Sequence, residues 1–274
     1  MSISRKKMFA FDLDGTLLNS EMELSEENIE ALTEARKKGH ILVMATGRNY
    51  IYSQIPMKEH WGLFDYYIGC NGAIIHSIHE RDVITYKENK IPFNFVMDII
   101  HEVREIGGTV QVSTEWNVFV GYYFNEVDTI IPTANKERFF DPYQSVFDMK
   151  EEDKASIIQI SVHFKEHNVK KYWEKWNKEF GDIYELTITS KHNIDINLKK
   201  ISKLSAMKEI VKIENILYDD VFVFGDSEND IKGLEYFNNT YAMENALPQA
   251  KQAAKHIIGN NNSKDIAKIV LKNI

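Results

Sequence analysis

The sequence predicts an α/β protein: a doubly wound, Rossmann-like parallel-sheet core into which an α+β domain is inserted. Short apolar runs alternate with helical stretches near both ends of the chain. Acidic residues follow two of these runs, where the strands of an open α/β sheet would end. Between about 88 and 196 the pattern changes to helices with alternating strands. A chain of 274 residues has room for two such domains.

The first βαβ unit lies at the N-terminal end of the chain. Residues 8–13 form an apolar run that stops at two acids and Gly15, as a buried strand followed by a sharp turn would. Ser25 is placed to cap the next helix, and Gly39 to end it. Residues 41–45 then form a second apolar run. The two runs are expected to be parallel strands joined by the helix.

The same alternation returns late in the chain. Further core strands are expected at 67–70, 221–224, 240–243 and 257–258. Core helices are expected at 203–213, 229–236, 248–255 and 263–272. We therefore assign residues 1–87 and 197–274 to one catalytic core.

The inserted domain is assigned to residues 88–196. Its expected helices are 92–106 and 167–180, and its expected strands are 109–114, 117–124, 184–189 and 193–197. Its aromatic side chains are expected to form its own core. They are Trp116, Phe119, Tyr122, Tyr123, Phe124, Phe139, Phe140 and Tyr143.

Composition limits the classes of partner. The formal charge of -8 and the pI near 5.6 would repel nucleic acid and anionic membranes, so we expect neither as a partner. Cys70 is the single cysteine, which excludes an internal disulfide and fits a reducing cytoplasm. The apolar run near the N-terminus is too short for a membrane span or a signal peptide. A cytoplasmic protein is expected.

Acidic residues follow two of the predicted strands. Asp12 and Asp14 lie two residues apart, and Asp226 and Asp230 lie one helical turn apart. Carboxylates this close repel each other unless a cation offsets their charge, which indicates a Mg²⁺ site. A solvated acidic turn is the plain alternative. A calcium-binding loop is disfavoured because Leu17 stands where that loop needs glycine.

Two further features are placed to bind an anion. Thr46 and Gly47 follow the second strand, where a hydroxyl and backbone N–H groups could form a nest for phosphate oxygens. Lys203 begins a predicted helix and would bring a positive charge to a phosphoryl group. From spacing alone, however, Lys203 is one of several lysines and is better interpreted as a solvated charge.

Four segments together resemble the motifs of the haloacid dehalogenase superfamily. They are FAFDLDGTLL (9–18), VMATGR (43–48), Lys203 and FGDSENDI (224–231), in that order. The sequence Asn71-Gly72-Ala73 and the long insert after it resemble the subgroup with a large α/β cap, the Cof-type hydrolases. The resemblance covers essentially the whole chain.

The resemblance implies a role for each matching residue. Asp12 would be the nucleophile and a metal ligand, and Asp14 the general acid and base whose backbone carbonyl also binds Mg²⁺. Asp226 would be the remaining protein ligand, supported by Asp230. Phosphate would contact Leu13, Thr46, Gly47, Lys203 and Asn229. Arg48, Asn71 and Gly72 would lie on the substrate side.

The implied function is a Mg²⁺-dependent phosphatase that acts on a small phosphorylated metabolite through a phosphoaspartyl group on Asp12. A phosphomutase would use a similar intermediate, and a signalling receiver domain would be about half as long and is less favoured. Glu244, Leu204 and Asp265 replace glycines that are common in the family. Turns at 114–117 and 190–193 are expected to contact the leaving group, which the sequence does not identify.

Overall fold

The structure is a computed structural model that describes residues 5–79, 82–85, 90–121, 144–164 and 169–274. The chain divides into two compact units. Unit 1 comprises Met1–Arg48, Tyr52–Thr85 and Ile201–Ile274, and unit 2 comprises Asn49–Ile51 and Tyr86–Lys200. The predicted fold class is confirmed. The predicted domain boundaries remain predictions, and the one at 87/88 lies outside the described residues.

Unit 1 is built on an eight-stranded sheet with the order β14-β13-β12-β1-β2-β3-β4-β5. The strands are β1 Met8–Phe11, β2 Ile41–Ala45, β3 Tyr66–Gly69, β4 Ile74–Ser77, β5 Asp82–Thr85, β12 Val221–Gly225, β13 Asn239–Met243 and β14 His256–Ile258. The six from β14 to β3 are parallel, and β4 and β5 pair antiparallel. The buried residues of β1, β2 and β12 form unbroken apolar runs, as strands covered on both faces require.

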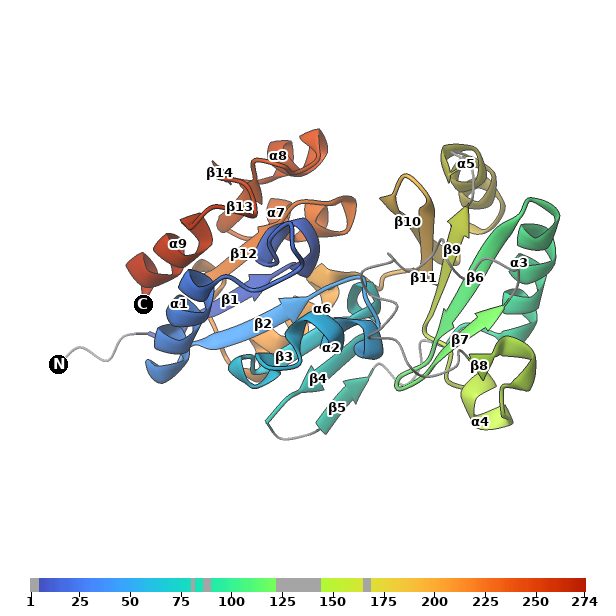
Figure 1. The fold of residues 1–274 in the computed structure, drawn as a ribbon, viewed down its shortest axis with the longest axis horizontal. Coiled ribbons are helices and arrows are strands. Elements are labelled where there is room, and N and C mark those ends of the chain that lie inside the picture. Colours follow the sequence, from blue (N-terminus) through green and yellow to red (C-terminus); the bar gives the residue numbers. More distant parts are fainter. Residues whose placement is uncertain (1–4, 80–81, 86–89, 122–143, 165–168) are drawn as a thin grey trace. The chain divides into compact units, whose positions relative to one another are not determined.

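The helices of this part of the chain alternate with the strands. They are α1 Glu26–Lys37, α6 Lys203–Ile213, α7 Ile231–Tyr236, α8 Pro248–Ala253, α9 Asp265–Asn273 and α2 Tyr50–Met57, whose first two residues are assigned to unit 2. The Ser25 side chain caps α1 by accepting from the Asn28 N–H, as predicted. α1 packs against α9, and α6 packs against α7. Figure 1 shows α1 in front of the sheet and α6 behind it.

The register of β1 decides where the acidic loops meet. Met8 pairs with Ile41 of β2 on one side and with Val221 of β12 on the other. After β1 the chain adds β2 and β3 on one side of β1, and it later adds β12 and β13 on the other side. β1 and β12 therefore lie next to each other at the point where the strand order reverses. Ligand sites of open α/β sheets lie at this point, beyond the carboxyl ends of the strands.

The hairpin of β4 and β5 was not expected from the sequence. Its first strand contains two isoleucines, then His76 and Ser77, so neither a long apolar run nor strict alternation marks it. Its strand character comes from pairing, because Tyr66 of β3 lies opposite Ser77. Tertiary pairing thus overrides a weak local pattern.

Unit 2 is built on a six-stranded sheet with the order β10-β11-β9-β6-β7-β8. The strands are β6 Gly108–Ser113, β7 Val118–Gly121, β8 Gln144–Ser145, β9 Gln159–Phe164, β10 Tyr184–Ser190 and β11 Asn193–Leu198. Central strand β9 was not predicted. The strand expected at 117–124 is described only as far as Gly121, and residues 122–124 lie outside the described residues.

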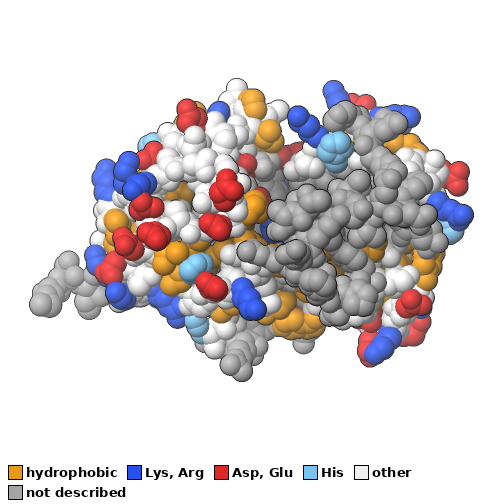
Figure 2. Space-filling model, in the orientation of Figure 1, with side chains coloured by type: hydrophobic (Ala, Val, Ile, Leu, Met, Phe, Trp, Pro, Cys, Tyr) orange, Lys and Arg blue, Asp and Glu red, His pale blue; other side chains and the backbone are white. Residues whose placement is uncertain are grey.

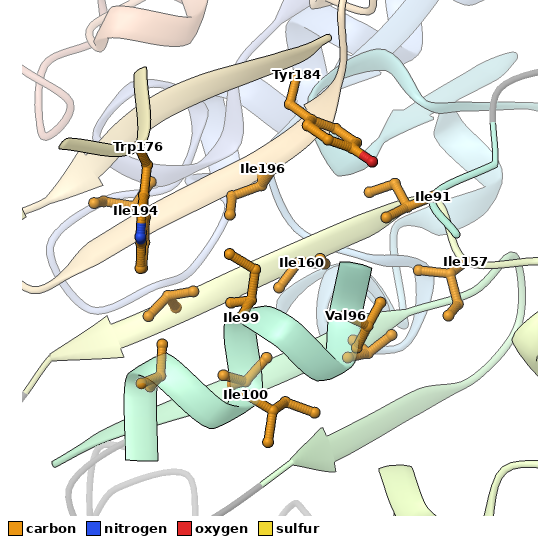
Figure 3. Close-up of a cluster of buried hydrophobic side chains, with 14 of the residues drawn as sticks. Ile91, Val96, Ile99, Ile100, Ile157, Ile160, Trp176, Tyr184, Ile194 and Ile196 are labelled. Atoms are coloured by element: carbon orange, nitrogen blue, oxygen red, sulfur yellow. The ribbon is translucent and has the colours of Figure 1, made fainter. Parts of the chain in front are cut away.

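Helices α3 Phe93–Glu105 and α5 Val169–Phe180 bury their apolar faces against unit 2's sheet, and a short helix, α4, spans Glu151–Lys154. Figure 3 shows part of the resulting cluster, with Trp176 and Ile194 among its members. Phe119 lies in this core, as expected, but Trp116 is 48% exposed, so the prediction was wrong there. The expected aromatics at 122–124, 139–140 and 143 lie outside the described residues.

The side chains that alternate with this core are polar. On β9 and β11 they include Gln159, Ser161, Asn193, Asp195 and Asn197, all but Ser161 less than a tenth exposed. Asp195 accepts hydrogen bonds from Ser161 (2.6 Å), Asn193 (2.8 Å) and Gln159 (3.4 Å). One face of the sheet is therefore an apolar core, and the other is a buried polar network.

Charges of both signs are interspersed over the visible face of unit 1 (Figure 2).

None of the helices in the described part of the chain combines the length and the apolar content needed to cross a bilayer.

Candidate active site

Two loops of unit 1 carry the acids, one after β1 and one after β12. The Asp12 N–H donates to the Phe224 carbonyl at 3.0 Å, which extends the strand pairing to the first acid. Gly15 then turns the chain at φ +77°, where a Cβ would lie 2.6 Å from Oδ2 of Asp226. Glycine is needed there both for its backbone angle and for the space. The two loops are thereby held in contact.

Lys203 lies at the centre of these acids. Its ammonium donates to Asp12 Oδ1 at 2.6 Å and to Asp230 Oδ1 at 2.8 Å, and its side chain is only 1% exposed. It is the first residue of α6, which begins with a reciprocal capping box between Ser202 and Ser205. The interpretation of Lys203 as a solvated lysine was therefore wrong, and spacing could not have revealed its burial.

Asp230 braces the loop that carries Asp226. Its Oδ2 accepts from the backbone N–H groups of Asp226 (3.0 Å) and Ser227 (3.1 Å), while its Oδ1 accepts from Lys203. Asp226 Oδ1 accepts from the hydroxyls of Ser227 (3.1 Å) and Thr16 (3.3 Å). Both oxygens of Asp230 are thus engaged within the protein, which suits support of a metal site better than direct ligation.

The charges in this site oppose one another. Burial raises the pKa of the Asp12 carboxyl well above its ordinary value, against the effect of Lys203 and together with the neighbouring acids. Burial and the Asp230 charge raise the pKa of Asp226 to about 6. Burial works against the ammonium of Lys203, but Asp12 and Asp230 outweigh it and raise the pKa of Lys203.

The donor set fits a divalent cation. Asp12, Asp226 and Asp230 each offer a carboxylate oxygen, and these atoms lie within 4.8 Å of one another. One ammonium faces three carboxylates, so the ionised cluster keeps a net negative charge in a largely buried place. Carboxylate oxygens are the ligands Mg²⁺ prefers, and a cation would relieve the repulsion that raises the pKa values. The Asp14 carboxylate is not part of this cluster.

Asp14 is held instead by Arg48. The guanidinium donates through Nε (2.7 Å) and Nη2 (2.6 Å) to the two carboxylate oxygens of Asp14, and its Nη1 donates to the Tyr52 carbonyl at 2.9 Å. Asp14 raises the pKa of Arg48 against the effect of burial. Arg48 was expected to lie on the substrate side, and the structure shows it paired with the predicted acid and base.

The turn after β2 contains Thr46 and Gly47, for which a phosphate nest was predicted. Thr46 is 1% exposed, and its hydroxyl accepts from the Arg48 N–H at 3.1 Å. The Thr46 N–H continues the strand by donating to Ile68 at 2.9 Å. Gly47 is half-buried between Thr46 and Arg48. The Leu13 side chain is fully buried, so this residue can offer only its backbone to a ligand.

Asn71, Gly72 and Asn229 are brought together. Asn71 is 3% exposed and accepts a hydrogen bond from Asn229 Nδ2 at 2.9 Å. A Cβ on Gly72 would lie 2.2 Å from the carbonyl oxygen of Ser202, just before Lys203. The expected phosphate ligand Asn229 therefore touches a residue that was expected to bind substrate.

Three polar residues of the site were missed from the sequence. Thr16 and Ser227 hydrogen-bond Asp226, and Asn245 Nδ2 donates to the Gly15 carbonyl at 2.7 Å. Thr16 and Ser227 stand in the two acidic loops themselves, a signal that could have found them. Asn245 follows the exposed Glu244 in another loop, so only the fold reveals its contact.

A comparison with protein families matches residues 9–270 to the model for haloacid dehalogenase-like hydrolases. The pyridoxal phosphate phosphatase YbhA of Escherichia coli is 26% identical, with 98% of each chain covered. The 5-amino-6-(5-phospho-D-ribitylamino)uracil phosphatase YcsE of Bacillus subtilis is 27% identical, also with 98% of each chain covered.

The solved structures that resemble this chain include a haloacid dehalogenase-like hydrolase from B. subtilis, which is 25% identical to it in sequence with a TM-score of 0.81. The alignment covers 96% of this chain and 98% of that one. The similarity extends through both units of the chain.

Proposed function

The chain belongs to the haloacid dehalogenase-like hydrolases, and from this premise we propose that it is a Mg²⁺-dependent phosphatase with Asp12 as its nucleophile. It is a hydrolase of phosphoric monoesters. The observation that carries the proposal is the setting of Asp12: a buried carboxylate at the end of β1, bonded to Lys203 and close to Asp226 and Asp230.

In the first step, an oxygen of Asp12 attacks the phosphorus of the substrate. An Asp12–phosphorus bond forms as the bond from phosphorus to the leaving oxygen breaks, and Asp14 donates a proton to that oxygen. A carboxylate needs no deprotonation to attack. Lys203 has its ammonium 2.6 Å from the nucleophile and can offset charge on the transferring group.

In the second step, Asp14, now ionised, takes a proton from a water molecule that attacks the same phosphorus. The bond to Asp12 breaks, inorganic phosphate leaves, and both acids return to their first state. Asp12 and Asp226, with the Asp14 carbonyl, would hold Mg²⁺, with Asp230 in support. The ion would supply positive charge to the phosphoryl oxygens.

For Asp14 to donate or accept a proton, at least one of its two hydrogen bonds with Arg48 must break. The two short hydrogen bonds from Arg48 occupy both carboxylate oxygens of Asp14. We therefore assign Arg48 to holding Asp14 at the site, with one of the two bonds released when Asp14 serves the leaving oxygen.

The substrate is proposed only as a small phosphorylated metabolite. YbhA and YcsE are named for different substrates at nearly the same identity to this chain, so identity does not choose between them. Unit 2 is proposed to set the choice of leaving group, with its turns at 114–117 and 190–193 as candidate contacts. A cytoplasmic location is part of the proposal and rests on the single cysteine.

The test is phosphate release from a panel of sugar phosphates, pyridoxal phosphate and flavin mononucleotide, with Mg²⁺ and after exhaustive chelation. We expect release from at least one substrate, loss on chelation and recovery when Mg²⁺ is restored. Full activity after chelation would contradict the metal requirement. Isomerisation of a sugar monophosphate that depends on a sugar bisphosphate activator, without net release of phosphate, would indicate a phosphomutase instead.

A further inference from the structure

The turn that follows β3 has an unusual backbone. Cys70, Asn71 and Gly72 have φ values of +50°, +57° and +105°, so three consecutive residues adopt positive φ. Residues with side chains rarely adopt this conformation, and asparagine is one of the few that tolerate it. All three residues are buried. Such a segment persists only where its surroundings hold it, and it often marks a functional place.

This 70–72 turn contacts three of the loops that carry the proposed phosphate site. The Cys70 and Asn71 N–H groups donate to the carbonyls of Arg48 (2.9 Å) and Thr46 (3.1 Å). Gly72 lies against Ser202, where any Cβ would collide with the backbone before Lys203. The side chain of Asn71 reaches the third loop through Asn229.

The hydrogen bond between the two asparagines orients the amide of Asn229. An amide nitrogen carries two N–H bonds, and the 2.9 Å bond to Asn71 Oδ1 uses one of them. Within the described part of the chain, the buried Oδ1 of Asn229 has no hydrogen-bond partner. The contact with Asn71 is thus what fixes which end of the Asn229 amide faces a ligand.

We propose that Asn71 is a positioning residue that acts through Asn229, and that it does not itself bind the substrate. The Asn71 carbonyl turns the NH₂ group of Asn229 so that its second N–H is available to a phosphoryl oxygen. Partners of this kind orient a ligand-binding group and are costly to remove. The inference rests on the proposed phosphatase function.

The effect should appear in binding more than in turnover. A neutral amide contacts the phosphoryl oxygens before and during the reaction, and loss of such uniform binding raises KM while kcat is kept. Loss of one hydrogen bond to a charged acceptor corresponds to roughly tenfold in affinity. We therefore expect KM for p-nitrophenyl phosphate and Ki for inorganic phosphate to rise together by about that factor.

The variant Asn71→Gly removes the side-chain amide and keeps the backbone conformation, because glycine adopts the same left-handed angles without strain. Its melting temperature should stay close to that of the parent. In this variant KM and Ki should rise roughly tenfold, with kcat changed less than about twofold. A fall in kcat at unchanged KM would overturn the proposal, since it would indicate displacement of the catalytic groups.

A double-mutant cycle with Asn229→Ala gives the decisive comparison. If Asn71 acts through Asn229, then Asn71→Gly should add less than about twofold to KM in the Asn229→Ala background. A full tenfold loss in both backgrounds would show that Asn71 contacts the substrate directly and would overturn the inference. A parent enzyme that releases no phosphate from any substrate would instead contradict the proposed function itself.

Discussion

Each unit of the chain buries an aspartate, and the two aspartates are held in different ways. Asp12 in unit 1 is 6% exposed and faces the ammonium of Lys203 together with two further acids. Asp195 in unit 2 is 4% exposed and accepts from three neutral side chains, those of Ser161, Asn193 and Gln159. Burial of a carboxylate is common to both regions, so burial alone does not mark the active site.

The two aspartates differ in the groups that offset the cost of burying them. Asp195 lies within a strand, and hydrogen bonds from its own sheet satisfy it. Asp12 lies beyond a strand end among like charges, and its pKa is raised well above the ordinary value by burial and by those neighbours. Functional sites are where such unfavourable arrangements are retained. We therefore expect a catalytic role for Asp12 and a structural role for Asp195.

The largest effect is expected from Asp12→Asn, which removes the proposed nucleophile at nearly constant volume. Phosphate release should fall by about 10⁴-fold or more, because an amide cannot form the phosphoaspartyl group. Asp195→Asn is the matched control and should keep activity toward p-nitrophenyl phosphate within about tenfold of the parent. Equal losses in the two variants would break the comparison.

Lys203→Met tests how strongly Asp12 and Asp230 depend on the Lys203 ammonium. Removal of one partner from a buried ion pair typically costs about 3–5 kcal/mol of stability. We expect a loss of this size in urea unfolding without divalent ions, followed through the α6 region by hydrogen exchange. The loss should shrink in an Asp12→Asn background. An unchanged unfolding midpoint would show that the acids are neutral without Lys203.

Arg48→Met tests whether Arg48 serves Asp14. A general acid matters most when the leaving oxygen is a poor leaving group, and it typically contributes about 10²–10⁴-fold. The variant should therefore lose roughly ten- to a hundredfold more kcat with an alkyl phosphate than with p-nitrophenyl phosphate. Parallel losses with both substrates would show that Arg48 acts on binding.

Asp195→Asn should have the smallest effect on the chemistry and a measurable one on stability. The new amide places a donor where Ser161 and Asn193 already donate, and each lost bond to a charged acceptor costs about 1.5–3 kcal/mol. Thermal unfolding, with hydrogen exchange on β9 and β11, should locate the loss in unit 2. An unchanged stability would show that the polar network of unit 2 is not structural.

The parts of the fold that follow strong local patterns were predictable. The apolar runs of β1 and β2, the cap at Ser25 and the glycine turn after Asp14 each have a local cause, and the structure has them all. β9 was missed although its apolar residues alternate with Gln159, Ser161 and His163, which is the local pattern of a half-buried strand and could have predicted it.

The candidate site was predictable in its members and not in its contacts. Motif resemblance selected Asp12, Asp226 and Lys203, and the structure brings them together. It did not reveal that Arg48 pairs with Asp14 or that Asn71 bonds to Asn229, because both contacts join loops far apart in the chain. Such contacts depend on sheet register and loop packing, which local sequence does not encode.

The most direct test of the account is to locate the phosphoryl group on the protein. The enzyme would be incubated with Mg²⁺ and beryllium fluoride, a phosphoryl mimic, and the adduct located by crystallography, with Asp12→Asn treated in parallel as the control. We expect an adduct on a carboxylate oxygen of Asp12, near Lys203, and none in the variant. An adduct on any other carboxylate, or one that persists in Asp12→Asn, would contradict it.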